Sequence, residues 1–390
     1  MKFPVYLDHN ATTPCDPRVL EHMMPWFTER FGNAASVHHP YGWLAEEAVE
    51  QAREQVAALI NARPKELVFT SGATESINLG IRGIMEANRD KGNHLITVAT
   101  EHRAVLDTCQ RLEETGTAVT YLPVDTRGLV DLNELENAIR PDTVMVIIML
   151  ANNETGVIQP IREVSALTQK HGILLFSDAV QAAGKIPVDV RALGVDIMPL
   201  SAHKMYGPKG VGALYMRRSG QGIKITSQIT GGGQEFGMRS GTLNVPGIVG
   251  YGMAAELALR EMDDEARRLQ TLRDRLEEGL LSTDGCYRNG HPQLRLPHVS
   301  HLSFEGVKGK DLLVAVNKEL AVSSGSACSS ITSKPSHVLT AMGLEEELAL
   351  SSLRFGLGRS TTEAQVDFAI RYLRNIVTDL KKQTTVSKTL

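Results

Sequence analysis

The stretch Ile173-Leu174-Leu175-Phe176-Ser177-Asp178 decides the fold of this 390-residue chain. It is a short apolar run that ends at an acid, the pattern of a buried strand with a carboxylate at its C-terminal end. A second apolar run, 195–200, is followed by Ser201-Ala202-His203-Lys204. Ligands of open α/β sheets bind outside the carboxyl ends of the strands, so the two runs predict that Asp178 and Lys204 share one crevice.

These two residues suggest the chemistry of pyridoxal phosphate. A lysine can hold the aldehyde of this cofactor as a Schiff base. An acid that pairs with the pyridinium nitrogen keeps it protonated, so that the ring acts as an electron sink. The alternative is an ordinary acid at a strand end and a surface lysine beside the Gly207–Gly210 turn, because two residues alone make a weak motif.

Size and composition indicate a soluble globular protein with a large and a small domain. At roughly 100–200 residues per domain, we place the large domain at 16–260, and the small one at 1–15 and 261–390 with a loop at about 322–334. The hydrophobic fraction is 42%, the charged fraction is 22% and the net charge is −4. These values predict a sizeable core and give no electrostatic reason to expect a nucleic-acid partner.

The four cysteines and the N-terminal residues bear on the compartment. The cysteines, at 15, 109, 286 and 328, form no Cys-x-x-Cys pair. This spacing fits neither a disulfide framework nor a zinc site, so we expect no metal and a reducing compartment. The N-terminus has no apolar signal region, and the longest apolar run, 144–150, is too short to cross a bilayer. We therefore expect a cytoplasmic protein that does not associate with membranes.

Seven apolar, β-rich runs alternate with helical or turn segments from residue 66 onward. They lie at 66–70, 95–99, 118–124, 144–150, 173–177, 195–200 and 211–216. Such alternation predicts an α/β fold with a mostly parallel seven-stranded sheet and helices on both faces. We expect an earlier helix from Pro17 to about Arg30, and a long charged helix at about 249–282 that leads into a smaller α+β domain. The last helix is expected at 362–381, followed by a frayed tail.

The segment Thr70-Ser71-Gly72-Ala73-Thr74-Glu75-Ser76 follows a strand and opens a helix. Free backbone N–H groups and the helix dipole make such a turn an anion site. We predict a phosphate cradle with Ala73 and Thr74 at its floor, and a plain helix cap is the alternative. The segment lacks Walker spacing, and no Gly-x-Gly-x-x-Gly follows the first strand, which disfavours a nicotinamide cofactor.

Three further residues lie on predicted strands or at their ends. His102, in Thr100-Glu101-His102, either stacks on an aromatic cofactor or caps a helix. Asn153, in 152–156, either hydrogen-bonds a carboxylate or ring hydroxyl without adding charge, or belongs to a turn. Arg354, between apolar neighbours, needs an anionic partner, which is either a substrate carboxylate or the acid of an ordinary ion pair.

Cys328 gives the sharpest local signal. Structural cysteines usually lie in apolar surroundings, whereas Cys328 lies among five serines and a glycine in 322–330. A thiol on such a loop can become a nucleophilic thiolate. We therefore predict a reactive Cys328 and find no comparable signal around the other three cysteines.

Together these stretches resemble the cysteine desulfurases of the NifS/IscS group, which are class V aminotransferases. The matching stretches follow the family order and lie at 6–8, 11–14, 71–76, 100–102, 151–156, 177–185, 201–210, 231–235, 238–242, 323–328 and 354–359. The resemblance implies the PLP-dependent transferase fold of type I. It also implies a PLP-dependent L-cysteine desulfurase that produces L-alanine and a persulfide on Cys328.

The resemblance implies four catalytic roles. Lys204 would form the Schiff base and act as general base, and Asp178 would pair with the pyridine nitrogen. His102 would stack on the ring. Cys328 would attack the substrate sulfur and carry it as a persulfide to an acceptor protein such as an iron–sulfur scaffold.

The resemblance also implies binding roles. Gln181 would hold the ring oxygen, and Asn153 would contact the cofactor and, with Arg354, orient the substrate carboxylate. Thr242 would reach the phosphate of the neighbouring subunit, which implies a homodimer. Four residues would bind the phosphate within the subunit: Ala73, Thr74, Ser201 and His203.

Several alternatives stay open. The chain could catalyse another class V reaction, that of a selenocysteine lyase or an aminotransferase, although an aminotransferase needs no thiol. It could also be a sulfur-relay or scaffold-binding protein with an inactive PLP fold. Ala202 stands where many members have glycine, and residues 382–390 lack the Ser-Pro-Leu-Trp segment of members that serve a scaffold. The acceptor is therefore open between iron–sulfur cluster assembly and thiolated cofactors or tRNA.

Overall fold

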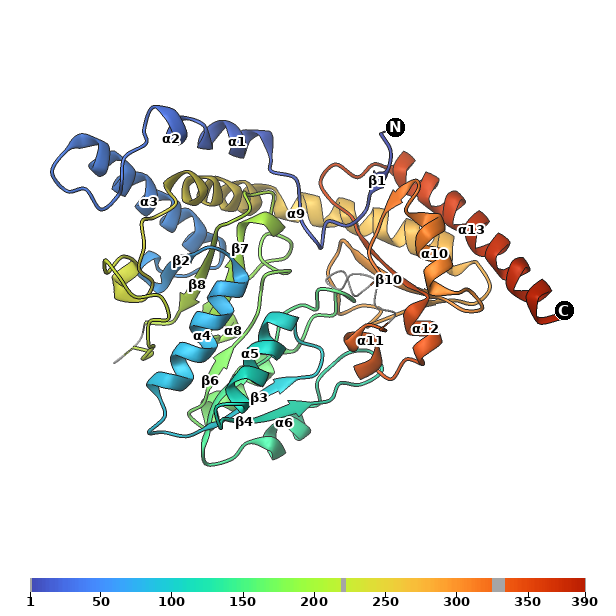
Figure 1. Cartoon of the computed structure of the whole chain (residues 1–390), viewed down its shortest axis with the longest axis horizontal. Helices are drawn as coiled ribbons and strands as arrows, with labels where there is room; N and C mark the ends of the chain where they lie inside the picture. Colours follow the sequence, from blue (N-terminus) through green and yellow to red (C-terminus); the bar gives the residue numbers. More distant parts are fainter. Residues whose placement is uncertain (1, 219–221, 325–333, 390) are drawn as a thin grey trace.

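The computed structural model describes the backbone of residues 2–218, 222–324 and 334–389, and side chains up to residue 383. Its largest sheet has seven strands in the order β2-β8-β7-β6-β5-β3-β4 (Figure 1). These strands are β2 (Leu67–Thr70), β3 (His94–Val98), β4 (Ala118–Leu122), β5 (Thr143–Ile147), β6 (Leu174–Phe176), β7 (Ile197–Ser201) and β8 (Gly212–Met216). Neighbouring strands from β7 to β4 are parallel, and β8 is antiparallel to β7 and β2. The mostly parallel seven-stranded sheet is therefore confirmed.

Helices cover both faces of this sheet because its strands are apolar on both sides. In β6, Leu175 lies in one hydrophobic core and Phe176 in the other, as the alternation of side chains along a strand requires. The helices on the Phe176 face are α4 (Ala73–Ala87) and α5 (Arg103–Glu113). The helices on the Leu175 face are α3 (Pro40–Leu59), α6 (Leu132–Ala138), α7 (Ile161–Lys170), α8 (Val190–Leu193) and the first half of α9 (Val245–Leu281).

A separate core is built around a three-stranded antiparallel sheet, where β10 (Val299–Phe304) lies between β9 (Cys286–Arg288) and β12 (Ser352–Gly356). The helices α10 (Gly309–Val316) and α13 (Glu363–Thr389) pack on it. The pair β1 (Val5–Tyr6) and β11 (Leu320–Ala321) adds the chain's N-terminal segment. Leu269 and Leu280 of α9 also belong to this core, so α9 links the two cores (Figure 1). The residue at which the chain divides into domains stays a prediction.

Two predicted helices differ from the structure. The helix expected from Pro17 to about Arg30 is divided into α1 (Pro17–Met23) and α2 (Pro25–Thr28). Pro25 has no N–H to continue the hydrogen-bond ladder of α1, so the helix stops and restarts there. The last helix extends through Thr389, so the expected frayed tail was wrong for the backbone. In the described parts of the chain, every helix is too short or too polar to cross a membrane.

Candidate active site

Asp178 and Lys204 come from neighbouring strands at the same edge of the sheet. Asp178 follows β6, and Lys204 ends the short turn Ala202–Lys204 that follows the parallel strand β7. The Asp178 carboxylate is buried and accepts the Val180 N–H at 2.9 Å. Burial raises the pKa of Asp178 to about 6, and the nearby Lys204 charge opposes that rise. A protonated ring nitrogen fits beside such a carboxylate, because a second cation stabilises its charged form.

The N-terminal segment holds Lys204 in this crevice. The Lys204 ammonium donates to the carbonyl oxygens of Asn10 at 2.5 Å and Ala11 at 2.7 Å. Thr13 donates its N–H and its hydroxyl to the carbonyl oxygen of His203, at 3.0 and 2.9 Å. The turn that carries the lysine is therefore fixed by residues far away in the sequence.

Asn10 connects three predicted site residues, although we assigned it no role from the sequence. Its carbonyl oxygen accepts from the Gln181 amide at 3.0 Å, as well as from Lys204. Its own amide donates at 3.4 Å to Gln181 Oε1 and to the Asn153 carbonyl oxygen. The Oδ1 atoms of Asn10 and Asn153 are buried without a hydrogen-bond partner. These oxygens suit the donors of a bound group, since buried polar atoms are normally paired. Asn10 lies between the family-like stretches 6–8 and 11–14, so no signal in the sequence identified it.

His102 caps α5 and lies in the field of Lys204. Its Nδ1 accepts the Ala104 N–H at 3.1 Å, so the proton of the neutral ring is on Nε2. Burial, and then the Lys204 charge, lower the pKa of His102. The capping alternative is thus present in the structure, and stacking of this neutral ring on a cofactor stays a prediction.

The start of α4 has the geometry of an anion cradle. Gly72 has φ +153°, which favours glycine, and an added Cβ there would meet nothing within 4 Å. The N–H groups of Ala73 and Thr74 have no acceptor within the helix, because they lie in its first turn. The N-cap residue supplies no side-chain acceptor either. Ser201 lies opposite Gly212, which lies opposite Thr70 at the start of the turn. A phosphate fits these donors.

His203 lies beside the same strand end in its neutral form. Its Nδ1 is 3.1 Å from the Thr12 hydroxyl. Burial lowers the pKa of His203 to about 4, helped by the charges of Lys204 and Lys209. The ring is therefore a neutral hydrogen-bonding group rather than a cation.

Arg354 is buried in β12 and already has an acidic partner. Its guanidinium donates to Asp8 Oδ1 at 2.8 Å and to the Asn153 carbonyl oxygen at 3.0 Å, while its Nε is buried without a partner. The ordinary ion pair that we kept as an alternative is thus present. A role of Arg354 in binding a substrate carboxylate stays a prediction.

Two predicted site residues remain, Thr242 and Cys328. Thr242 is exposed on the segment before α9, and within the described residues no hydrogen bond connects it to another predicted site residue. Cys328 lies outside the described residues. Burial raises the pKa of Cys15, and raises that of Cys109 and Cys286 to about 12, so these three thiols are poor nucleophiles.

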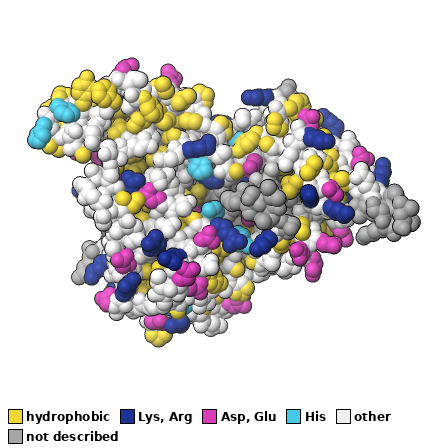
Figure 2. Space-filling view, viewed as in Figure 1, with side chains coloured by type: hydrophobic (Ala, Val, Ile, Leu, Met, Phe, Trp, Pro, Cys, Tyr) yellow, Lys and Arg dark blue, Asp and Glu magenta, His cyan; other side chains and the backbone are white. Residues whose placement is uncertain are grey.

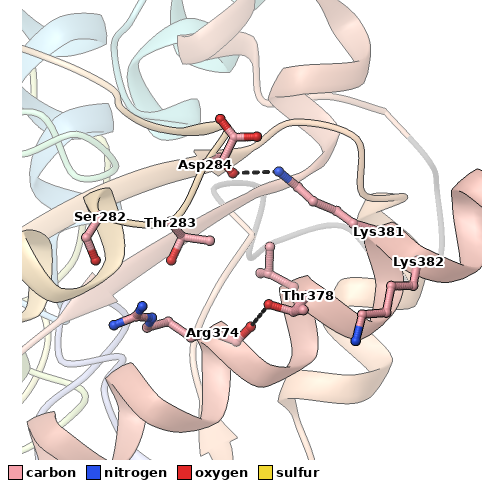
Figure 3. A pocket seen from close by; sticks show the side chains of 8 residues that line it. Ser282, Thr283, Asp284, Arg374, Thr378, Lys381 and Lys382 are labelled. Carbon is pink, nitrogen blue, oxygen red and sulfur yellow. Dashed lines mark hydrogen bonds between the residues drawn. The ribbon is translucent and has the colours of Figure 1, made fainter.

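A cavity of about 660 Å³ lies apart from the crevice, between the end of α9 and α13 (Figure 3). Lys381 donates to the carbonyl oxygen of Asp284 at its rim, and the Thr378 hydroxyl donates to that of Arg374. None of the described residues that line this cavity is a predicted site residue. Among the residues with described side chains, no group of three or more His, Cys, Asp or Glu could hold a metal ion.

The chain is similar to several known proteins over most of its length. The family model "Aminotransferase class-V" matches residues 5–368. Cysteine desulfurase IscS of Anaeromyxobacter dehalogenans (strain 2CP-C) is 54% identical over 383 residues, which cover 98% of this chain and 94% of that protein. A solved NifS-like protein has a TM-score of 0.90 and 40% identity, with coverage of 97% and 100%. SspA in complex with cysteine has a TM-score of 0.81 and 37% identity, with coverage of 90% and 98%.

Proposed function

We infer that this chain, which belongs to the class-V aminotransferase family, is a pyridoxal phosphate-dependent cysteine desulfurase. Its substrate is L-cysteine, and its products are L-alanine and a persulfide on Cys328. The observation that carries this proposal is the buried Asp178 beside Lys204, at the ends of adjacent parallel strands.

Different residues of the crevice bind different parts of the cofactor. When bound, pyridoxal phosphate supplies the electron sink that stabilises charge at the substrate Cα. Asp178 holds a proton on the ring nitrogen, and Gln181 binds the ring oxygen. The N–H groups of Ala73 and Thr74 hold the phosphate, together with Ser201 and a neutral His203.

Substrate binding and proton transfer fall to other residues. Arg354 and Asn153 orient the carboxylate of L-cysteine from the edge formed by β12 and the segment after β5. Lys204, which lies beside Asn10, removes the proton at Cα as general base in its neutral amine form.

Sulfur transfer needs no external oxidant. The Cys328 thiolate attacks the substrate sulfur, a sulfur–sulfur bond forms, and the carbon–sulfur bond breaks. The electron pair of the broken bond stays with carbon, which takes up a proton and becomes the methyl group of alanine. The persulfide is then passed to an acceptor, for iron–sulfur cluster assembly or for thiolated cofactors or tRNA.

A homodimer is supported by a large apolar surface on α1, α2 and the start of α3. Figure 2 shows hydrophobic side chains gathered over this corner of the molecule. The surface, here called the N-terminal apolar surface, consists of eight side chains that are 48–64% exposed: Leu20, Met24, Phe27, Phe31, Val37, Tyr41, Trp43 and Leu44. Apolar patches of this extent mark protein interfaces. We assign a second copy of the chain to this surface and Thr242 to the phosphate of that copy, in a cytoplasmic enzyme.

The dimer is tested with Phe27→Glu combined with Phe31→Glu. A matched control is Val314→Glu on α10, because Val314 is 62% exposed outside the N-terminal apolar surface. The double variant should sediment as a monomer and the control as a dimer. A dimeric double variant contradicts the assignment.

The reaction is tested by alanine release from L-cysteine with excess thiol reductant. The wild type should release alanine and sulfide in equal amounts, and Cys328→Ala should release neither. If Cys328→Ala matches the wild type, the persulfide step is wrong and a lyase reaction gains support. If the cofactor-loaded wild type releases no alanine, the substrate is another amino acid.

A further inference from the structure

Ser336 attaches the segment that follows residues 325–333 to the large sheet through hydrogen bonds. It is the N-cap of α11 (His337–Ala341), and its hydroxyl accepts the N–H groups of Val338 at 3.1 Å and Leu339 at 3.3 Å. The same hydroxyl donates its proton to Glu154 Oε2. Both side chains are buried, with 4% and 3% exposed. A hydroxyl has one proton and two lone pairs, so this hydroxyl is fully paired by these contacts.

Two more contacts attach α11 to other strand ends of the same sheet. His337 Nε2 is 2.9 Å from the carbonyl oxygen of Glu101, and because a carbonyl can only accept, His337 donates. Met342 packs against Gly128, where an added Cβ would lie 3.5 Å from the Met342 sulfur. The segment after Cys328 thus rests on the loops that follow β3, β4 and β5.

The strand ends that receive α11 are the ones that carry predicted site residues. Glu154 follows Asn153 directly, and its backbone N–H donates to Asn152 Oδ1 at 2.9 Å, which fixes this turn. On the other side of 325–333, the Ser323 carbonyl oxygen accepts the Arg354 N–H at 2.7 Å. Ser323, before the Cys328 stretch, therefore bonds to Arg354, which would orient the substrate carboxylate. Ser336, after the stretch, bonds to Glu154, the neighbour of Asn153.

We propose that Glu154 and Ser336 are positioning residues for sulfur transfer, whose hydrogen bond fixes the point where the chain leaves the Cys328 stretch. This inference rests on the proposed function, because it gives the substrate sulfur to Cys328. A nucleophile held near its target reacts faster than a loosely tethered one, so the bond acts on the rate of transfer. Among the described residues, neither side chain hydrogen-bonds a residue assigned to the cofactor ring or its phosphate, so cofactor binding should not depend on the bond.

Three variants separate this role from a merely structural one in the cofactor-loaded enzyme. Glu154→Leu removes the acceptor at similar volume, Ser336→Ala removes the donor, and Glu154→Gln keeps an acceptor oxygen. The matched control is Ser165→Ala in α7, where a buried serine hydroxyl donates to the Gly194 carbonyl oxygen at 2.9 Å, away from the crevice. The readouts are cofactor absorbance, its change with L-cysteine concentration, and alanine formed in one turnover.

Glu154→Leu and Ser336→Ala should keep the cofactor and its response to L-cysteine, while alanine formation slows about tenfold or more. Glu154→Gln should retain most of the wild-type rate, and Ser165→Ala should match the wild type throughout.

Three results overturn the inference: wild-type alanine formation in Glu154→Leu, loss of the cofactor or of its response to L-cysteine in that variant, or a Glu154→Gln enzyme as slow as Glu154→Leu. Cys328→Ala in the same assay identifies which proposal has failed. If Cys328→Ala is inactive and Glu154→Leu is fast, only the positioning role is wrong. If Cys328→Ala is itself as fast as the wild type, the persulfide step is wrong and the positioning role falls with it.

Discussion

Two buried acids at the edge of one sheet, Asp178 and Glu154, have different partners. Asp178 accepts a backbone N–H and lies in the field of the Lys204 ammonium, whereas Glu154 accepts a hydroxyl proton from Ser336. Burial raises the pKa of both, to about 6 for Asp178 and about 7 for Glu154. The same chemical group thus serves two purposes, and the partner of each carboxylate decides which purpose it serves. Asp178 is placed to pair with a cation of a bound group, and Glu154 is used to hold another part of its own chain.

The largest effect is expected from Asp178→Asn, which tests the cofactor half of the comparison. An amide cannot hold the proton on the ring nitrogen, so alanine formation should fall about a thousandfold, roughly 4 kcal/mol of barrier. The measurement is single-turnover alanine formation, with cofactor absorbance as a check on loading. A fall of less than about tenfold in the loaded variant would make the two acids equivalent and contradict the comparison.

Glu154→Gln tests the architectural half through the pH dependence of stability. The folded state raises the pKa of Glu154 from its ordinary 4.5 to about 7, so it binds a proton that the unfolded chain releases between these values. Wild-type stability therefore falls as pH rises through this window, by about 3 kcal/mol from this group. The variant lacks this loss, and other groups cancel in the difference.

The measurement for Glu154→Gln is urea unfolding of both proteins from pH 4 to pH 8. The free energy of unfolding of the variant minus that of the wild type should increase with pH and level off above about pH 7. A difference that does not change with pH means that Glu154 has the same pKa in the folded and unfolded states.

Arg354→Lys should have a smaller effect, and on substrate binding alone. Lysine keeps the charge but lacks the planar fork that binds a carboxylate with two hydrogen bonds. The KM for L-cysteine should rise about tenfold, or about 1.4 kcal/mol, with cofactor loading unchanged. A change in kcat without a change in KM would instead assign the Arg354 side chain to the ion pair with Asp8.

The smallest effect is expected from Lys381→Gln, at the cavity between α9 and α13. Its volume of about 660 Å³ is that of an ordinary ligand site, but none of the described residues that line it belongs to the crevice. Alanine formation should stay within about twofold of the wild type, since surface changes away from special contacts have small effects. A large loss of alanine formation would mean that Lys381 affects the active site.

Local sequence patterns predicted the fold and part of the site. The apolar runs that end at Asp178 and before Ser201 predicted two buried strands, and both are present in one parallel sheet. The ends of helices were predicted less reliably, because Pro25 divides a helix that the sequence pattern predicted to be continuous. Glycine and helix-start signals at 70–76 correctly predicted a strand, a turn and a helix.

The contacts that complete the crevice join residues far apart in the chain and leave no local pattern. Asn10 meets Lys204 across 194 residues, and Glu154 meets Ser336 across 182 residues. Asn10 and Glu154 look like ordinary turn residues in the sequence. Only tertiary packing, which brings the N-terminal segment and α11 onto the strand ends, shows what they bind.

Peptide mass spectrometry can detect the transfer of sulfur from L-cysteine to Cys328 itself. The cofactor-loaded enzyme is mixed with one equivalent of L-cysteine, without reductant, and digested. The Cys328 peptide should gain one sulfur atom, and an equal amount of alanine should form. Alanine with free sulfide and an unchanged Cys328 peptide would contradict the transfer of sulfur to Cys328.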